Sequence, residues 1–304
     1  MQSYPPVGKL VDVGGHRLHV HTTGQGSPTV VLEAGGGSWS LDWSLVQPEV
    51  ARFTRVCSYD RAGFGWSDPG PQPRTSQQII KELHALLVNA RLSGPYVFVG
   101  HSFGGYTARL YASQYPGEVM GMVLIDARHQ ALVSRLPPAW RRQETIAAGM
   151  YRFLSTMARL KLLGLLGALM GEKAAPPVVK KLPPEIRPMY LAVGFQPKYF
   201  DANLDELAAS AESDKQLSAT GSLGNMPLTV IRHGMPDLFA SMPADQARQA
   251  EQIWQELQAD LAGLSSNSKL VVAEKGGHGI PVDQPALVVD AIRQVVEIVR
   301  RASP

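Results

Sequence analysis

The sequence has almost no cysteine and few charged residues. Cys57 is the single cysteine among 304 residues, so an internal disulfide bond is excluded. No grouping of Cys and His has the spacing of a structural zinc site, which disfavours chemistry by a thiol or a bound metal. Charged residues make up 18% of the chain and apolar residues 44%, which is too apolar a balance for a disordered chain. We therefore expect a globular protein that uses no metal or other cofactor.

Clusters of positive charge and long apolar runs are also missing. The net charge is +3, and Lys and Arg are spread along the chain, so nucleic-acid binding is not expected. Residues 160–170 form too short a run to span a bilayer; contact of this region with a membrane surface stays open but is not expected. Residues 1–6 lack the basic start and apolar run of a signal peptide, which predicts a cytoplasmic protein. A removed leader or anchor, and the oligomeric state, stay open.

Short apolar runs alternate with helical patterns along most of the chain. This alternation is typical of βαβ units and predicts an α/β fold with a mostly parallel sheet. Strands are predicted at residues 9–13, 16–22, 29–33, 55–59, 96–99, 120–125, 228–232 and 269–273, and helices at 42–52, 76–90, 106–115 and 285–300. The second strand carries His16, His19 and His21, which alternate between its two faces and are predicted to be surface residues rather than metal ligands.

One long interval breaks this alternation. Two predicted strands, 120–125 and 228–232, are separated by far more than the usual connection of about 2–6 residues, so an inserted subdomain is required. The interval contains an apolar helical stretch, a proline-rich hinge and a further helical pattern, at residues 150–170, 174–178 and 185–211 respectively. We predict a core formed by residues 1–126 and 227–304, with a helical cap or lid at residues 127–226.

Residues 100–104 read Gly-His-Ser-Phe-Gly and match the G-x-S-x-G nucleophile elbow. A predicted strand leads into this segment and a predicted helix leads out of it, as the motif requires. The tight turn needs small residues on both sides of the serine, and Gly100 and Gly104 satisfy that need. We predict that Ser102 is a nucleophile; a serine in an ordinary glycine-rich turn is the alternative. His101 is predicted to pack at the elbow and is a candidate substrate contact.

A serine hydroxyl needs a neighbouring base, and a neutral imidazole suits that task near pH 7. Eight histidines are present, but only His278 lies in a glycine-flanked loop directly after a predicted strand near the chain end. We predict that His278 is the general base.

With these motifs the chain resembles the α/β-hydrolase superfamily, and the resemblance covers nearly all of it outside the cap. Further segments agree in order: Leu-Glu-Ala-Gly-Gly-Gly at residues 32–37, Tyr-Asp-Arg-Ala-Gly-Phe-Gly-Trp-Ser-Asp at 59–68, Gly-Gly-His at 276–278 and Asp-Gln-Pro at 283–285. Ala34 stands where the family often has a histidine. The resemblance implies an eight-stranded, mostly parallel sheet flanked by helices, with a helical cap inserted between strands 6 and 7.

Backbone N–H groups that stabilise a developing oxyanion are expected in two places. The first is the amide of Phe103, directly after the nucleophile, and the second is that of Gly36, which matches the family's oxyanion loop. Its neighbours Gly35 and Gly37 are candidate substrate contacts, because glycine permits close backbone approach. A plain turn is the alternative for this loop.

The acid that orients the base has two candidates. Asp126 follows the strand at 120–125, where some relatives carry the acid, and Asp237 follows the strand at 228–232, where most do. The interval from Asp237 to His278 includes a long helix and exceeds the usual family spacing. We therefore predict Asp126, with Asp237 as the alternative.

These residues favour a serine carboxylesterase that cleaves short-to-medium acyl or aromatic esters through an acyl-enzyme intermediate. The substrate would be a small-molecule ester, since the cap is rich in apolar residues. A serine at the elbow argues against the superfamily's epoxide hydrolases and haloalkane dehalogenases, which use aspartate there. The alternatives are a lipase, lactonase, thioesterase, proline iminopeptidase or perhydrolase, or a non-catalytic small-molecule receptor on the same fold.

Ser102→Ala is expected to abolish ester turnover and leave the protein folded, because only one oxygen atom is lost at a turn. Initial rates on a soluble p-nitrophenyl ester test this, with circular dichroism as the folding control. His278→Ala should be comparably damaging, and the double variant no slower than either single one, because nucleophile and base act as a unit. Full residual activity in Ser102→Ala would remove Ser102 as the nucleophile.

Overall fold

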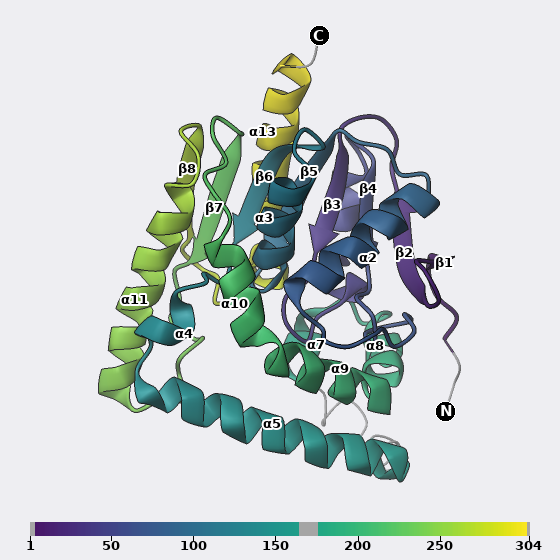
Figure 1. Cartoon of the computed structure of the whole chain (residues 1–304), viewed down its shortest axis with the longest axis vertical. Helices are drawn as coiled ribbons and strands as arrows, with labels where there is room; N and C mark the ends of the chain where they lie inside the picture. Colours follow the sequence, from purple (N-terminus) through teal and green to yellow (C-terminus); the bar gives the residue numbers. More distant parts are fainter. Residues whose placement is uncertain (1–3, 164–175, 303–304) are drawn as a thin grey trace.

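The computed structural model describes residues 4–163 and 176–302 and contains one eight-stranded sheet (Figure 1). The strand order is β1-β2-β4-β3-β5-β6-β7-β8, with β2 antiparallel to its neighbours β1 and β4 and the remaining pairs parallel. The strands are β1 (Lys9–Asp12), β2 (Arg17–Thr23), β3 (Thr29–Glu33), β4 (Val56–Tyr59), β5 (Tyr96–His101), β6 (Val119–Ile125), β7 (Leu228–His233) and β8 (Ser268–Ala273). The mostly parallel sheet predicted from the sequence is confirmed.

Helices cover both faces of the sheet. One face packs against α2 (Ser76–Asn89) and α3 (Gly104–Gln114), and the other against α1 (Gln47–Val50) and α13 (Pro285–Ala302). The central strands are therefore buried on both sides, which explains why their sequences are apolar runs rather than alternating patterns. A further long helix, α11 (Ala244–Ala262), connects β7 and β8.

The interval between β6 and β7 contains a series of helices. They are α4 (Leu132–Arg135), α5 (Pro138–Arg159), α7 (Pro177–Lys181), α8 (Arg187–Gly194), α9 (Pro197–Ala208) and α10 (Ser210–Ser218). In Figure 1, α5 runs across the end of the molecule toward which the parallel strands point. Trp39 of the core stacks on Tyr190 of α8 with ring centroids 4.0 Å apart, which helps to hold the inserted helices against the core.

Two predicted helices differ from those observed. The helix predicted at 42–52 is split into a 3₁₀ turn, η1 (Ser40–Trp43), and the short α1, because Pro48 lies in the first turn of α1 and cannot continue a helix from before it. The helix predicted at 150–170 begins earlier, at Pro138, and ends at Arg159; residues 164–170 lie outside the described part of the chain. The predicted hinge at 174–178 also lies partly outside it.

The prediction that His16, His19 and His21 are surface residues is wrong for His19. His19 has no exposed surface: its Nδ1 lies 2.9 Å from a carboxylate oxygen of the buried Asp60, and its Nε2 accepts a hydrogen bond from the backbone of Gly8. His16 and His21 are half-buried. Leu18, His19 and Val20 are all buried, and successive side chains of a strand point to opposite faces, so both faces of β2 are covered at this point.

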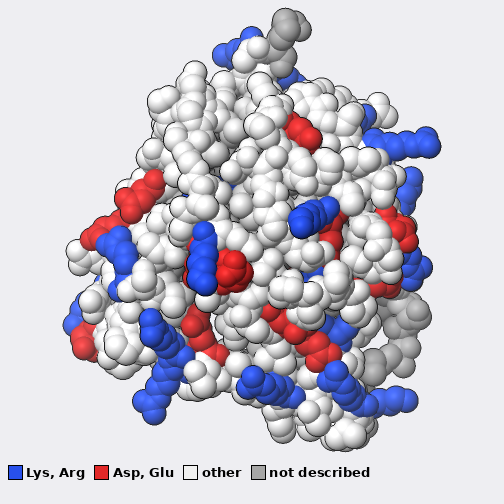
Figure 2. Space-filling model, in the orientation of Figure 1, with Lys and Arg blue, Asp and Glu red and all other residues white. Residues whose placement is uncertain are grey.

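Charges of both signs are mixed on the surface. On the face drawn in Figure 2, Lys and Arg side chains lie among Asp and Glu side chains and form no continuous basic area. Among the described residues, no helix combines the length and the apolar character needed to cross a membrane.

The buried face of α13 gives a test of this packing. Ile292→Ala is expected to lower the free energy of unfolding by about 2–5 kcal/mol, because Ile292 is fully buried against the sheet. Ile298→Ala on the same helix is the matched control; Ile298 is 41% exposed, and a change within about 0.5 kcal/mol is expected. Urea denaturation measures both, and equal losses would contradict this arrangement of the helix.

Candidate active site

The ends of four neighbouring parallel strands bring the candidate catalytic residues together. In the registers of the sheet, His101 at the end of β5 pairs with Ile125 at the end of β6, and Ile125 pairs with Ile231 of β7. Ser102 directly follows β5, Asp126 follows β6, and His278 lies in the loop after β8. Residues more than a hundred positions apart in sequence thus meet at one edge of the sheet.

Ser102 sits in a strained turn between β5 and α3. Its φ of 51° lies in the left-handed region, which a non-glycine residue rarely adopts. A side chain at Gly100 would bring a Cβ to 2.6 Å from the carbonyl oxygen of Gly104, so the turn requires glycine at that point. The Ser102 N–H donates to the carbonyl of Ile125 at 3.0 Å, which ties the elbow to the end of β6.

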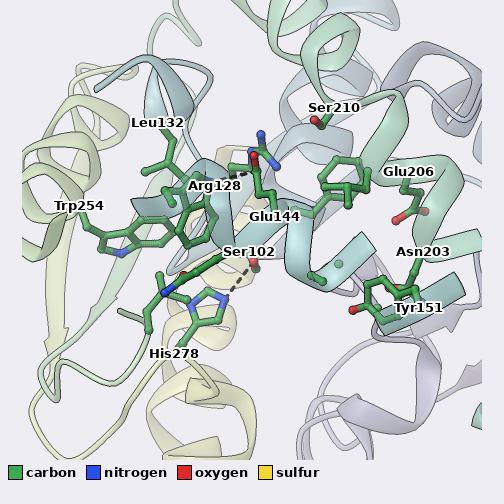
Figure 3. A pocket seen from close by; sticks show the side chains of 18 residues that line it. Ser102, Arg128, Leu132, Glu144, Tyr151, Asn203, Glu206, Ser210, Trp254 and His278 are labelled. Atoms are coloured by element: carbon green, nitrogen blue, oxygen red, sulfur yellow. Dashed lines mark hydrogen bonds between the residues drawn. The ribbon is translucent and has the colours of Figure 1, made fainter. Parts of the chain in front are cut away.

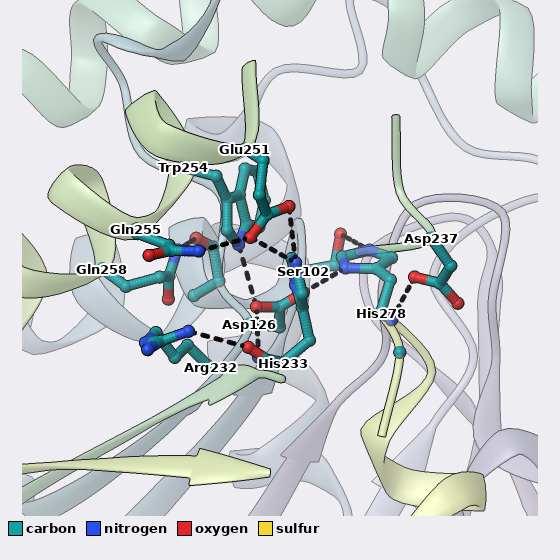
Figure 4. A network of polar contacts seen from close by, with 12 residues as sticks. Ser102, Asp126, Arg232, His233, Asp237, Glu251, Trp254, Gln255, Gln258 and His278 are labelled. Carbon is teal, nitrogen blue, oxygen red and sulfur yellow. Dashed lines mark hydrogen bonds and ion pairs between the residues drawn. The ribbon is translucent and has the colours of Figure 1, made fainter. Parts of the chain in front are cut away.

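The imidazole of His278 bridges a serine and a carboxylate. Its Nε2 lies 3.0 Å from the Ser102 Oγ, and its Nδ1 lies 2.6 Å from an Asp126 Oδ2, so that the ring donates to the carboxylate and accepts from the hydroxyl. Asp237 occupies a different place: its Oδ1 accepts the backbone N–H of His278 at 2.7 Å. The geometry therefore favours Asp126 as the acid and gives Asp237 the task of holding the histidine loop (Figure 4).

Asp126 is fully buried and its carboxylate is saturated with donors. Oδ1 accepts from the backbone N–H of His233 and the indole N–H of Trp254, while Oδ2 accepts from ring nitrogens of His278 and His233. Burial alone would raise the pKa of this carboxyl, but the hydrogen bonds from His233 and His278 outweigh it and hold the pKa well below its usual range. The carboxylate is therefore charged throughout the pH range in which an imidazole titrates.

His233 and Glu251 complete this cluster, and sequence reasoning did not identify either of them. The His233 Nδ1 lies 2.7 Å from Asp126 and its Nε2 lies 2.9 Å from Glu251. Burial would lower the pKa of His233, but the hydrogen bonds and charges of the two carboxylates raise it to about 10. The position of His233 at the end of β7, beside β6, could have indicated that it lies close to Asp126. No such signal exists for Glu251 of α11, because the sequence does not show how a helix is rotated against the sheet.

The candidate oxyanion donors lie on two loops that meet. An added Cβ at Gly36 would lie 3.9 Å from the Cβ of Phe103, so the loop after β3 approaches the elbow closely. Among the hydrogen bonds of the described residues, the N–H groups of Gly36 and Phe103 donate none. Arg61 supports this loop: its guanidinium donates to the carbonyls of Ala34 and Gly35 at 2.7 and 2.8 Å.

Two predicted substrate contacts need correction. Gly37 and Gly36 line the pocket, but Gly35 and His101 do not. An added Cβ at Gly35 would lie 3.0 Å from the ring of His101, so these residues pack against each other behind the nucleophile. The ring of His101 donates from Nε2 to the carbonyl of His278 at 2.8 Å, and burial lowers its pKa to about 4, which keeps it neutral. Both residues support the site rather than line it.

A cavity of about 440 Å³ opens beside Ser102 and His278 (Figure 3). One part is lined by Leu132, Trp140, Leu238 and Trp254, which pack in one apolar cluster, while Phe103 and the charged side chains of Arg128 and Glu144 also line the cavity. The opposite part carries polar groups from the inserted helices, namely Tyr151, Asn203, Glu206 and Ser210. In the part of the chain that the structure describes, no group of three or more His, Cys, Asp or Glu side chains could hold a metal ion.

The roles of the two aspartates can be separated by substitution. Asp126→Asn is expected to lower kcat by orders of magnitude, about 10⁴-fold for the same change in a serine protease, because an amide favours the wrong tautomer and cannot stabilise the imidazolium. Asp237→Asn should be mild, because that residue contacts only the backbone of the histidine loop. Steady-state kinetics on one ester compare them, and the reverse ranking would transfer the role to Asp237.

Comparison with known proteins agrees with this architecture. The sequence is 29% identical over 289 residues to the uncharacterized protein YqjL of Bacillus subtilis, covering 94% of this chain and 91% of that protein. The fold is similar to that of a thermophilic esterase from Thermogutta terrifontis, with a TM-score of 0.62 and 25% identity over 93% of this chain and 94% of the other. It is also similar to that of the epoxide hydrolase CorEH, with a TM-score of 0.70 and 19% identity over 94% and 97%. Residues 18–291 match the family described as Alpha/beta hydrolase family, and the chain belongs to that family.

Proposed function

We propose that this protein is a serine carboxylesterase that uses Ser102, His278 and Asp126 as a catalytic triad. The observation that carries the proposal is the continuous chain of hydrogen bonds from the Ser102 hydroxyl through the His278 ring to the buried Asp126 carboxylate. The similarity to the Thermogutta terrifontis esterase supports ester chemistry. A serine at the elbow supports an acyl-enzyme route.

Acylation begins when the Ser102 Oγ attacks the carbonyl carbon of the ester. The hydroxyl proton passes to the His278 Nε2, and the negative charge of Asp126 stabilises the imidazolium that forms. The carbonyl oxygen becomes an oxyanion, toward which the N–H groups of Phe103 and Gly36 would donate, each contributing about 3 kcal/mol. The bond to the leaving oxygen then breaks as His278 returns the proton to it, and an alcohol departs.

Deacylation repeats these steps with water. His278 takes a proton from the water molecule as it attacks the acyl-enzyme, and returns it to the Ser102 Oγ as the acyl bond breaks. The products are a carboxylic acid and the regenerated hydroxyl. The strained φ of Ser102 keeps the nucleophile exposed at the tip of the turn, so both halves of the reaction use the same geometry.

The two-part lining of the cavity supports a substrate with one apolar and one polar portion. Leu132, Trp140 and Trp254 suit a short-to-medium acyl chain or an aromatic ring. The groups on the opposite part suit an alcohol portion that carries hydroxyl or amide groups. Residues 127–226 supply much of both parts, so we assign them to a cap that selects the substrate.

A panel of soluble p-nitrophenyl esters of increasing acyl length tests this proposal. We expect the highest kcat/KM for short-to-medium or aromatic acyl groups, and slower turnover of emulsified long-chain lipid. No turnover of any ester by the wild type, with the fold intact, would contradict the proposal; a strong preference for emulsified lipid would favour a lipase instead.

The cap assignment is tested by truncating a cavity side chain. Trp140→Ala is expected to change the relative kcat/KM across acyl lengths by several-fold, because Trp140 lines the apolar part. It should leave the amount of acyl-enzyme formed unchanged. Ile146→Ala is the matched control on the same helix, since Ile146 is 63% exposed and lies outside the cavity lining. An unchanged acyl-length profile in Trp140→Ala would remove this residue as a selector.

A further inference from the structure

We propose that His233 and Glu251 form a buried ion pair that positions Asp126 and sets the basicity of His278. The inference rests on the proposed function, because it assigns His278 the role of general base. It makes His233 and Glu251 positioning residues, since both act through Asp126. Figure 4 shows the two histidines converging on the Asp126 carboxylate from different strands and loops.

The hydrogen-bond partners fix the proton count of the pair. The His233 ring is 1% exposed and has a carboxylate oxygen at each nitrogen, at 2.7 Å on the Asp126 side and 2.9 Å on the Glu251 side. A neutral imidazole can donate from only one of its nitrogens. The lone pair of the other nitrogen would then face a carboxylate oxygen, and the two would repel each other. We therefore place one proton between each ring nitrogen of His233 and the carboxylate that it faces. With both protons present, the pair of His233 and Glu251 carries no net charge.

The neutrality of the His233–Glu251 pair matters because a single oxygen of Asp126 accepts hydrogen bonds from two histidine rings. Both ring nitrogens, from His278 and from His233, lie within 2.7 Å of the same Oδ2. An uncompensated imidazolium at His233 would cancel the charge that stabilises protonated His278 and would lower the pKa of the base. The Glu251 carboxylate compensates that charge, so the cluster keeps the single negative charge that a triad requires.

Among the described residues, further side chains contact the cluster or its backbone. The guanidinium of Arg232 donates to the backbone carbonyl of His233 at 3.0 Å, Gln255 donates to Glu251 at 2.9 Å, and Asp237 holds the backbone of the His278 loop. The neutral His101 binds the carbonyl of His278. None of these groups is replaced in the variants below.

The arrangement also supports the position of the acid. Asp126 follows β6 with a φ of 44°, a conformation that needs support from its surroundings. Its N–H donates to the carbonyl of Ile231 in β7, and its carboxylate accepts a hydrogen bond from the backbone N–H of His233. The ring of His233 also contacts the carboxylate, so this one residue of β7 holds Asp126 through both its backbone and its side chain.

The test is a set of charge-changing substitutions read by the pH dependence of kcat/KM, which reports the pKa of the base in the free enzyme. Glu251→Gln leaves an uncompensated cation beside Asp126, so the apparent pKa of the kcat/KM profile should fall by roughly one unit. His233→Gln leaves Glu251 without its partner and adds negative charge to the cluster, so the apparent pKa should rise by roughly one unit. The double variant His233→Gln/Glu251→Gln should return close to the wild-type value.

Glu256→Gln is the matched control. It removes an equal charge from the same helix, but Glu256 is exposed and pairs with Arg135 of the inserted segment. Its pH profile should match that of the wild type. A merely structural role of His233 and Glu251 would lower the rate or the stability without moving the pKa in opposite directions. Unshifted profiles in both single variants, or shifts of the same sign, would overturn the proposal.

A measurement without substrate separates this inference from the proposed function. Nitrogen-15 NMR of histidine-labelled wild-type protein reports the protonation of each ring, and we expect His233 to keep both ring protons at pH 7 and 8. A neutral His233 ring that lacks a proton on the Glu251 side at pH 7 would overturn the inference even if the enzyme hydrolyses esters. If no ester is hydrolysed, the proposed function fails and this NMR result still decides the state of the pair.

Discussion

A carboxylate without exposed surface lies at the junction of β6 and β7, where Asp126 accepts hydrogen bonds from two imidazole rings, an indole and a backbone amide. Burying a charge is costly unless donors replace the lost water, and these donors do so. The position of His278, and through it the hydrogen bond to Ser102, depends on this carboxylate. Helix α11 takes part directly, because its Trp254 donates to the carboxylate and its Glu251 pairs with His233.

The parallel sheet explains how such distant residues come to share one carboxylate. Carboxyl ends of parallel strands meet at one edge, so the residues that follow β5, β6 and β7 are neighbours whatever lies between them in sequence. Ser102 follows β5, Asp126 follows β6, and His233 is the last residue of β7. Asp237, the alternative acid, follows β7 and instead binds the backbone of the histidine loop.

Motif and strand patterns were sufficient to predict the sheet, the elbow and the candidate base, because each depends on local constraints such as glycine around a tight turn. The preference for Asp126 over Asp237 came from chain spacing, and the observed geometry favours the same residue. His19 and His233 were not understood from sequence, because whether a histidine in a strand is buried depends on its neighbours in space. The partners Glu251 and Trp254 depend on how α11 rotates against the sheet, which no local pattern specifies.

Covalent labelling shows whether Ser102 is a nucleophile that His278 activates. The intact protein is treated with a fluorophosphonate, and the modified peptide is identified by mass spectrometry. We expect one phosphonyl group per chain, attached to the Oγ of Ser102, and a labelling rate that collapses in His278→Ala. An unlabelled wild-type protein, or a label on any other residue, would contradict this role of Ser102.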